Sequence, residues 1–281
     1  MENSYGNKFR LIRQNRNKSL RLTSEGITSK SSLDRWERGQ DNLSFNQVLQ
    51  LIKKLHIRPI ELINNGLAKE IVQDIREVED AYLENNTDFL LRICQLQDHV
   101  ILSGRDFWKV ALACNCYMEL TGKNIFTQTN RKRLKNYFLK IEDWYYEDFM
   151  NFGNTALLLD SSDIFRISAQ IVNYVKFAEL QDNENYQIVY NTLINAVYIL
   201  IRGNTDLAKR LLSYFSSDLI PQKYAFERIR YYFMTLLLDY CESRDDSKIK
   251  VELDFLKMNN LDLLHEVCEY SFQQVKAGQK S

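Results

Sequence analysis

Residues 29–38 concentrate hydroxyl, carboxylate and cationic side chains within ten positions of the 281-residue chain. An arginine here can donate two hydrogen bonds to one guanine, an aspartate can accept from a cytosine amine, and serine hydroxyls suit phosphate oxygens. We expect Arg35 to contact guanine, and Asp34 to accept from a cytosine or repel a phosphate. Arg10, Arg13 and Lys30 are expected to bind phosphates. The predicted DNA-contacting set is Arg10, Arg13, Ser29, Lys30, Ser31, Ser32, Asp34, Arg35 and Arg38.

Each of these side chains also has a plain structural explanation. Any one of them could be a solvated surface group, and Arg38 could pair with a nearby acid. Taken singly, the two explanations are about equally good. Taken together in one helical scaffold, the residues favour contact with DNA.

The segment that carries these residues has clear signals for a helix over 30–38. Ser29 can cap its start, and Gly39 can end it in the left-handed conformation. Leu33 and Trp36 are three residues apart and should face inward, which leaves the polar residues nearer the solvent.

Four more short helices are predicted around this one. The first begins after Ser4, and the second ends at Gly26. The fourth follows a capping box of Ser44 and Gln47, and Pro59 opens the fifth. The apolar stripe of the fourth is predicted to contain Phe45, Val48, Leu49, Ile52 and Leu55. Five short helices in this arrangement are typical of a helix-turn-helix domain.

Charge divides the chain into a basic head and an acidic body. Residues 1–64 contain twelve lysines and arginines against six acidic residues, a net charge of +6. Residues 65–281 contain 25 basic and 31 acidic residues, a net charge of −6. This asymmetry is expected when only one part meets a polyanion. We therefore predict two domains, residues 1–64 and residues 65–281.

Two levels of resemblance to known regulators rest on motifs in the head. Three motifs resemble the Cro/repressor (Xre-type) helix-turn-helix. They are Trp36-Glu37-Arg38-Gly39, Arg10-x-x-Arg13 and Leu49-x-x-Ile52-x-x-Leu55-x-Ile57. The longer run 26–39 is more specific, because it resembles the Rgg/GadR/MutR regulators, in which Ser-Lys-Ser precedes an Arg-aromatic-Glu-Arg-Gly ending. In the body, Trp144-Tyr145-Tyr146-Glu147 and Phe152-Gly153-Asn154 resemble the same family.

The resemblance implies a homodimeric, DNA-binding transcription regulator. A helix-turn-helix would be joined to an all-helical repeat domain that senses a short, secreted and re-imported peptide. Two positions depart from the family. Phe45 stands where many members have a cysteine that can link the two DNA-binding domains, so this chain cannot form that disulfide. Asp34 replaces a commoner neutral polar residue, so the preferred operator can differ.

The body is predicted to consist of successive helices with short polar breaks. Nine glycines and two prolines in the whole chain leave few turn residues for a many-stranded sheet. Helix pairs recur at roughly forty residues, in the range of tetratricopeptide-like and HEAT-type α-solenoids, which have an extended concave surface. The tetratricopeptide consensus itself is absent, so we predict a divergent tetratricopeptide-like array. The predicted fold is all-α, a five-helix head followed by this solenoid. The predicted body helices are 67–85, 88–102, 106–121, 131–150, 154–160, 163–181, 184–203, 205–216, 222–243, 247–259 and 262–277.

Amide side chains follow one side of the predicted helix 184–203. Asparagine and glutamine one turn apart can bind peptide N–H and C=O groups without requiring a particular side chain. For any single residue, an ordinary wet helix surface is the better explanation. Extended to neighbouring helices, the predicted peptide-binding set is Asn151, Asn154, Arg166, Gln170, Asn173, Gln187, Asn191, Asn195, Tyr198 and Arg230. The apolar stretch 249–275 could cap the solenoid or form a dimer interface.

The sequence argues against several other classes. Three scattered histidines lie in no nucleophile signature, and no phosphate-binding glycine loop or dinucleotide fingerprint occurs, so we predict no enzyme and no cofactor. Cys114 and Cys116 are two residues apart and share no helical face, so we predict no metal site. Without a signal peptide or an apolar stretch of ~20 residues, we expect a reduced cytoplasmic protein and no membrane partner.

The predicted function is therefore a DNA-binding transcriptional regulator whose repeat domain senses a short peptide in quorum sensing. The predicted partners are double-stranded operator DNA, the peptide and a second copy of the chain, with a pivot near residues 64–66. If peptide leaves operator affinity unchanged, we expect the body to regulate another step, such as contact with RNA polymerase. The body could instead sense a partner protein or metabolite, or the chain could be a helical scaffold that does not bind DNA. Activation or repression, the peptide and the operator stay open.

Overall fold

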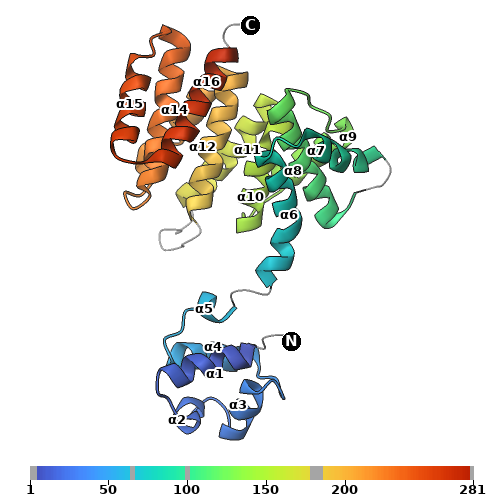
Figure 1. Cartoon of the computed structure of the whole chain (residues 1–281), viewed down its shortest axis with the longest axis vertical. Coiled ribbons are helices and arrows are strands. Elements are labelled where there is room, and N and C mark those ends of the chain that lie inside the picture. Colours follow the sequence, from blue (N-terminus) through green and yellow to red (C-terminus); the bar gives the residue numbers. More distant parts are fainter. Residues whose placement is uncertain (1–4, 64–66, 99–101, 178–185, 279–281) are drawn as a thin grey trace. The chain divides into compact units, whose positions relative to one another are not determined.

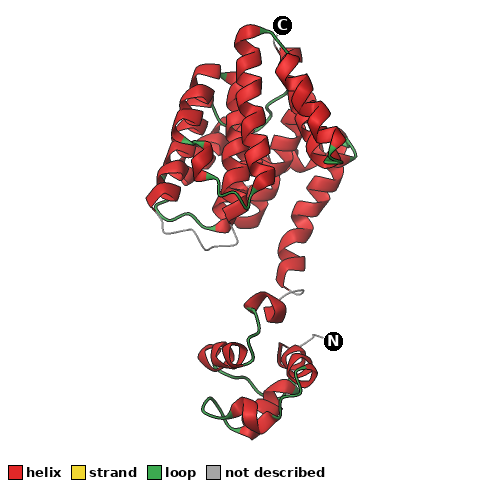
Figure 2. Ribbon diagram, turned by 90° about the vertical axis from the view of Figure 1, so that its left-hand side faces the viewer, coloured by secondary structure: helices red, strands yellow, loops and turns green. Residues whose placement is uncertain are grey.

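The structure, a computed structural model, describes residues 5–63, 67–98, 102–177 and 186–278. All regular secondary structure in these residues is helical (Figures 1 and 2), which confirms the predicted all-α class. The chain divides into two compact units, Met1–Glu77 and Val78–Ser281. The boundary lies within helix α6 (Leu67–Leu83).

The first unit contains the five predicted short helices. They are α1 (Tyr5–Asn15), α2 (Leu20–Ser24), α3 (Lys30–Glu37), α4 (Phe45–Lys54) and α5 (Pro59–Ile63). Their ends follow the local signals: the Ser29 hydroxyl accepts from the Ser32 amide at the start of α3, and Gly39 adopts φ 70° after its end. The capping box of Ser44 and Gln47 is also formed.

The core of this unit is built where α1, α3 and α4 meet. Phe9, Leu33, Trp36 and Leu51 are buried, and the rings of Phe9 and Trp36 lie 5.2 Å apart. Gly6 lets α1 approach α3 closely, because a β-carbon there would overlap the Trp36 carbonyl oxygen.

One part of the predicted α4 stripe is wrong. Phe45 is 73% exposed and Leu49 is also exposed, whereas Leu51 is buried in their place. At 3.6 residues per turn, the inward face runs through Val48, Leu51 and Leu55, so positions 45 and 49 fall outside it.

The second unit is a stack of antiparallel helices around α12 (Tyr186–Gly203). This helix packs against α10 (Tyr146–Thr155), α11 (Ser161–Phe177) and α14 (Ala225–Ser243), and Figure 1 shows it between α11 and α14. The remaining helices are α7 (Thr87–Cys94), α8 (Gly104–Thr121), α9 (Gln128–Leu139), α13 (Thr205–Tyr214), α15 (Ser247–Met258) and α16 (Asp262–Gly278), with 3-10 turns at Gln95–Asp98, Ala156–Leu158 and Ser217–Leu219.

The predicted single helix 131–150 is wrong, because the chain forms α9 and α10 with a break between them. The break lets Trp144 enter the core, where its ring stacks on Phe138 and Phe149 at interplanar angles of 5° and 26°. Asp148 then caps α10 by accepting a hydrogen bond from the Tyr145 amide at 3.0 Å. The predicted helix 154–160 is also replaced, by the end of α10 and a 3-10 turn before α11.

Candidate functional sites

The outward face of α3 carries the predicted DNA-contacting groups. Leu33 and Trp36 are buried as expected, and Ser29, Lys30, Ser31 and Arg35 are exposed. An eight-residue helix with one apolar edge in the core thus presents its polar edge to solvent, the arrangement that major-groove recognition requires.

Several of these side chains already have partners within the unit. Arg35 pairs with Asp41 at 2.7 Å, and Arg38 pairs with Asp34, which is the structural explanation expected for Arg38. Ser29 and Ser32 hydrogen-bond each other at the start of α3. Because exposed ion pairs contribute only ~0–1 kcal/mol, DNA can compete for both arginines.

The structure corrects the expectation that Arg13 contacts phosphate. Arg13 is only 7% exposed, and its Nε and Nη2 atoms donate to the two carboxylate oxygens of Glu37 at 2.7 and 2.6 Å. Its Nη1 donates to the Lys18 carbonyl oxygen at 2.7 Å. The hydrogen bond to Glu37 raises the pKa of Arg13 above its usual value. Arg13 therefore joins α1 to α3 and cannot reach a ligand.

Two other predicted phosphate contacts are free to act. Arg10 on α1 and Lys30 on α3 are exposed, and neither forms an ion pair within the described residues. These two cations of the predicted set can bind DNA phosphates without first breaking an ion pair.

A second candidate site is a groove of about 530 Å³ in the second unit, which we call the central groove. Side chains from α6, α8, α10, α12, α14 and α16 line it. The predicted peptide-binding residues that reach this lining are Asn154, Asn195, Tyr198 and Arg230.

Two more predicted residues, Gln187 and Asn191, act behind the lining. The buried Glu227 accepts hydrogen bonds from Gln187 at 2.8 Å and from Asn191 at 3.3 Å. Asn191 in turn accepts from Arg230 Nη1 at 2.6 Å, and Asn195 accepts from Arg230 Nη2 at 2.7 Å. Burial lowers the pKa of Arg230, and an arginine stays charged under such a shift. The network thus holds a cation in the groove in one orientation.

At another part of the central groove, Glu119 organises a second cluster. Arg202 donates to both of its carboxylate oxygens, at 2.8 and 2.9 Å, and the Tyr270 hydroxyl donates to it at 3.2 Å. The Arg202 guanidinium lies 5.4 Å from the centre of the Tyr198 ring. Burial raises the pKa of Tyr198 to about 12, so its hydroxyl stays protonated and can donate.

The central groove contains enclosed polar atoms that lack hydrogen-bond partners. Among the described residues, Asn115 Oδ1 and the Tyr198 hydroxyl oxygen have none of ordinary geometry. Asn151 Nδ2, on α10 one turn before Asn154, is also unpaired. Leaving such atoms unpaired costs ~1–3 kcal/mol each, so a polar ligand that pairs them has a favourable binding contribution.

The remaining predicted residues do not reach this groove. Arg166, Gln170 and Asn173 are exposed along α11 and are absent from the lining, because α11 turns Ile164, Ile167 and Ile171 inward instead. Sequence reasoning also missed lining residues. These are Glu79 and Tyr82 of α6, Asn115, Cys116 and Glu119 of α8, and Glu266, Cys268, Tyr270 and Ser271 of α16.

Comparison with known proteins gives the family. The family model of the C-terminal domain of the HTH-type transcriptional regulator Rgg matches residues 106–271, which is more than half of the chain. The chain belongs to the Rgg family. Its first unit supplies the helix-turn-helix. The family match covers all the lining residues of the central groove except those of α6.

Several solved structures have the same fold as this chain. The SHP pheromone receptor Rgg2 of Streptococcus dysgalactiae has a TM-score of 0.75 and 19% identity, over 96% of this chain and 99% of that one. The PrgX/cCF10 complex has a TM-score of 0.68 and 16% identity, over 98% and 93%. A bacterial peptide pheromone/receptor complex has a TM-score of 0.67 and 15% identity, over 98% and 99%.

Three further observations bear on the predicted partners, metal site and thiols. Across the described residues, no helix combines the length and apolarity needed to cross a bilayer, and no cluster of three or more His, Cys, Asp or Glu could hold a metal ion. None of the five cysteines forms a disulfide, and four of them are buried.

Proposed function

We propose that this Rgg-family regulator binds operator DNA as a homodimer and senses a short peptide in the central groove. The observation that supports a peptide ligand is that amide side chains and enclosed polar atoms without hydrogen-bond partners occur around the same cavity. A peptide backbone offers alternating N–H and C=O groups, which such a lining can pair from both sides.

The chemistry of the groove suits a peptide of mixed character. Asn115, Asn154 and Asn195 offer both donors and acceptors, and Arg230 offers a fixed cation for a carbonyl or carboxylate oxygen. The same groove also has an apolar surface on which peptide side chains can pack, formed by Leu112, Ile199, Met234 and Val267. The neighbours in fold include a pheromone receptor and a pheromone/receptor complex, which supports the same ligand class here.

On DNA, α3 would enter the major groove with its first turn toward the base edges. Arg35 would exchange Asp41 for guanine O6 and N7, and Asp34 would set the neighbouring base or exclude a phosphate. Arg10 and Lys30 would bind phosphates, and the hydroxyl of Ser31 would reach the backbone or a base edge. Ser29 and Ser32 would act mainly by holding the start of α3.

Homodimerisation is supported by an exposed apolar stripe on α15. Val251, Phe255 and Met258 are spaced four and three residues apart and are 69, 45 and 76% exposed. Leu261, just before α16, and Leu263, in its first turn, are also exposed. A stripe of this kind favours a dimer interface over a polar solenoid cap for this part of the chain. Two linked heads would then read two half-sites about one DNA turn apart.

Regulation would follow if peptide occupancy favours one arrangement of the two heads. A ligand can shift such an equilibrium only by its difference in affinity for the two states. The predicted pivot at residues 64–66 lies outside the described residues. If peptide does not alter operator affinity, the body would regulate another step, such as contact with RNA polymerase.

The test is titration of a labelled operator duplex with the full-length protein, with and without synthetic peptides encoded beside its gene. We expect one peptide to raise the melting temperature and to change either operator affinity or transcription in a reconstituted reaction. An Asn195→Ala variant should need roughly tenfold more peptide for the same response, whereas Gln170→Ala, on the exposed face of α11, should respond as the wild type does. Stabilisation by a metabolite or partner protein, with none by any peptide, would contradict the proposal.

A further inference from the structure

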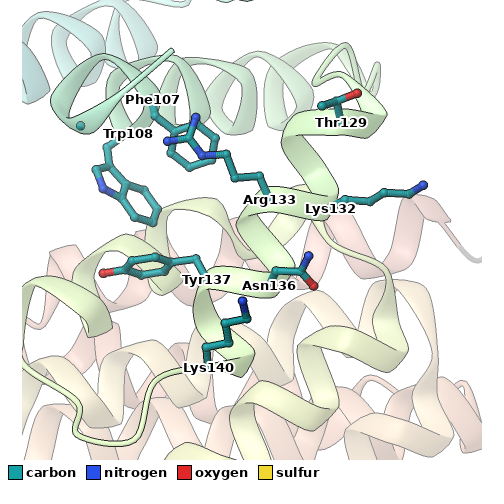
Figure 3. A pocket seen from close by; sticks show the side chains of 9 residues that line it. Phe107, Trp108, Thr129, Lys132, Arg133, Asn136, Tyr137 and Lys140 are labelled. Carbon is teal, nitrogen blue, oxygen red and sulfur yellow. The ribbon is translucent and has the colours of Figure 1, made fainter. Parts of the chain in front are cut away.

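A second cavity, separate from the central groove, lies between the start of α8 and α9. It has a volume of about 630 Å³ and shares no lining residue with the central groove. Figure 3 shows its lining side chains, which come from one face of α9 and the first turns of α8. The lining residues are Gly104, Phe107, Trp108, Thr129, Lys132, Arg133, Asn136, Tyr137 and Lys140.

The charge of this cavity is its most unusual property. Lys132, Arg133 and Lys140 line it and no carboxylate does, although the chain beyond residue 64 is acidic overall. Within the described residues, none of the three cations has a carboxylate partner. By contrast, Arg131 and Lys135 of the same helix pair with Asp160 and Asp163, at 3.7 and 2.7 Å. The cations without a carboxylate partner are therefore those that face the cavity, although Arg133 Nη1 also donates to the Leu102 carbonyl oxygen.

Aromatic rings from both α8 and α9 also line the cavity. The Arg133 guanidinium lies 4.3 Å from the centre of the buried Phe107 ring, and the Trp108 and Tyr137 rings meet edge to face with centres 5.0 Å apart. The Tyr137 hydroxyl donates to Asp148 at 2.6 Å, which fixes the direction of the ring. Because Tyr137 is 41% exposed and Trp108 is half-buried, both rings still offer surface to a flat ligand (Figure 3).

Two polar features complete the lining. Asn136 lies one helical turn before Lys140 on the cavity face of α9, and its amide can both donate and accept. Gly104 belongs to the first turn of α8, an 18-residue helix whose N-cap Ser103 makes no side-chain capping bond. The positive end of that helix dipole adds to the attraction for an anion.

We propose that this cavity binds a nucleoside phosphate. The phosphate would lie among Lys132, Lys140 and Arg133, the base would stack on Tyr137 and Trp108, and Asn136 would hydrogen-bond to the base edge or the sugar. An inorganic anion would leave the aromatic rings unused, and an apolar ligand would leave three cations without an anionic partner. The volume is in the range of roughly 300–1,000 Å³ of small-ligand pockets. The site would give the regulator an input besides the peptide.

The test uses the full-length protein and isothermal titration calorimetry with AMP, GMP, ADP and GDP. Inorganic phosphate and the nucleosides adenosine and guanosine provide the two halves of the ligand. We expect at least one nucleotide to bind roughly tenfold or more tightly than either half, because charge-assisted hydrogen bonds and stacking then act together. Binding should also quench the fluorescence of Trp108, since Trp36 and Trp144 are buried away from solvent.

Charge-neutral variants tie the binding to this cavity. The double variant Lys132→Gln, Lys140→Gln should weaken nucleotide binding roughly tenfold or more, and Asn136→Ala should alter the preference among bases. Lys123→Gln is the matched control, since Lys123 is equally exposed and lies outside the cavity. All three lysines are exposed, so the variants should melt at the wild-type temperature.

Three results would overturn the proposal. They are phosphate binding as tightly as every nucleotide, nucleotide binding unchanged in the double variant, and no binding by any nucleotide at millimolar concentration. None of these residues belongs to α3 or the central groove, so such a failure leaves the peptide and operator proposals standing.

Discussion

Arg13 of α1 and Glu37 of α3 form a buried, two-pronged ion pair inside the helix-turn-helix unit. Glu37 lies between Trp36, which is in the core, and Arg38, which is at the surface. The pair therefore connects the packing of the unit to the helix expected to read DNA. Removing one partner of the pair is expected to be strongly destabilising, because the buried Glu37 carboxylate would then have no partner of opposite charge.

Arg13→Ala should destabilise the first unit by about 3–5 kcal/mol, because it leaves Glu37 buried without its cation. Urea unfolding followed by far-UV circular dichroism should show an early transition for this unit. Arg13→Met combined with Glu37→Leu should recover much of the loss, since both charges are then removed. If Arg13→Ala keeps wild-type stability and only lowers DNA affinity, the structural role assigned to Arg13 is wrong.

Within the first unit, contacts between residues close in sequence were predictable, whereas a contact between distant residues was not. The caps at Ser29, Gly39 and Ser44 were predictable because each cap involves residues at most three positions apart. The pair between Arg38 and Asp34 could be foreseen for the same reason. Arg13 and Glu37 are 24 residues apart, and nothing in the local pattern distinguishes Arg13 from the exposed Arg10.

The central groove was predictable along one helix and not across helices. The α12 positions Asn195 and Tyr198 followed from the periodicity of that helix. Asn115 and Glu119 are about 80 positions away on α8 and reach the groove only through packing. The amides of α11 were misplaced because a sequence with polar residues on one face does not say which neighbouring surface that face meets.

Arg35 and Arg10 should affect DNA binding in different ways. Arg35→Ala should cost ~1–3 kcal/mol on the cognate operator and relax discrimination at one base pair. Arg10→Ala should weaken cognate and scrambled duplexes alike and reduce the salt dependence by about one unit. Fluorescence anisotropy at two salt concentrations separates these outcomes. Equal losses from both variants on both duplexes would refute the division between base and phosphate contacts.

The apolar stripe on α15 predicts a variant that dissociates the dimer without unfolding the chain. Phe255→Lys should shift sedimentation equilibrium toward monomer, because it places a charge in the middle of the proposed interface. Leu83→Lys is the matched control, since Leu83 is 75% exposed and lies outside the stripe, and this variant should stay dimeric. The melting temperature of both variants should match the wild type at low concentration. A Phe255→Lys protein that stays dimeric places the interface elsewhere.

The thiols of the central groove should be unreactive. Burial raises the pKa of Cys116 and of Cys268 to about 12, so almost no thiolate is present at pH 8. A raised pKa in the folded state contributes stability below the unfolded value of 9.0, and this contribution is lost as pH rises from 9 toward 12. Alkylation by iodoacetamide at pH 8 should be far slower than in urea. Rapid modification of either thiol in the folded protein would contradict this.

Asn195 offers the sharpest test of the peptide proposal, because it contacts Arg230 and lines the groove at once. Asn195→Ala removes an acceptor from the guanidinium, so Arg230 loses one of two fixed contacts and the peptide loses an amide partner. We expect peptide affinity to fall by roughly tenfold, because the lost hydrogen bonds contribute about 1–2 kcal/mol. Operator affinity measured without peptide should stay unchanged. Calorimetry with the cognate peptide measures the first and anisotropy the second. Gln170→Ala should alter neither value, since Gln170 is a comparable amide on the exposed face of α11. Equal losses from both variants would mean that the peptide binds across the outer surface of α11 and not in the groove.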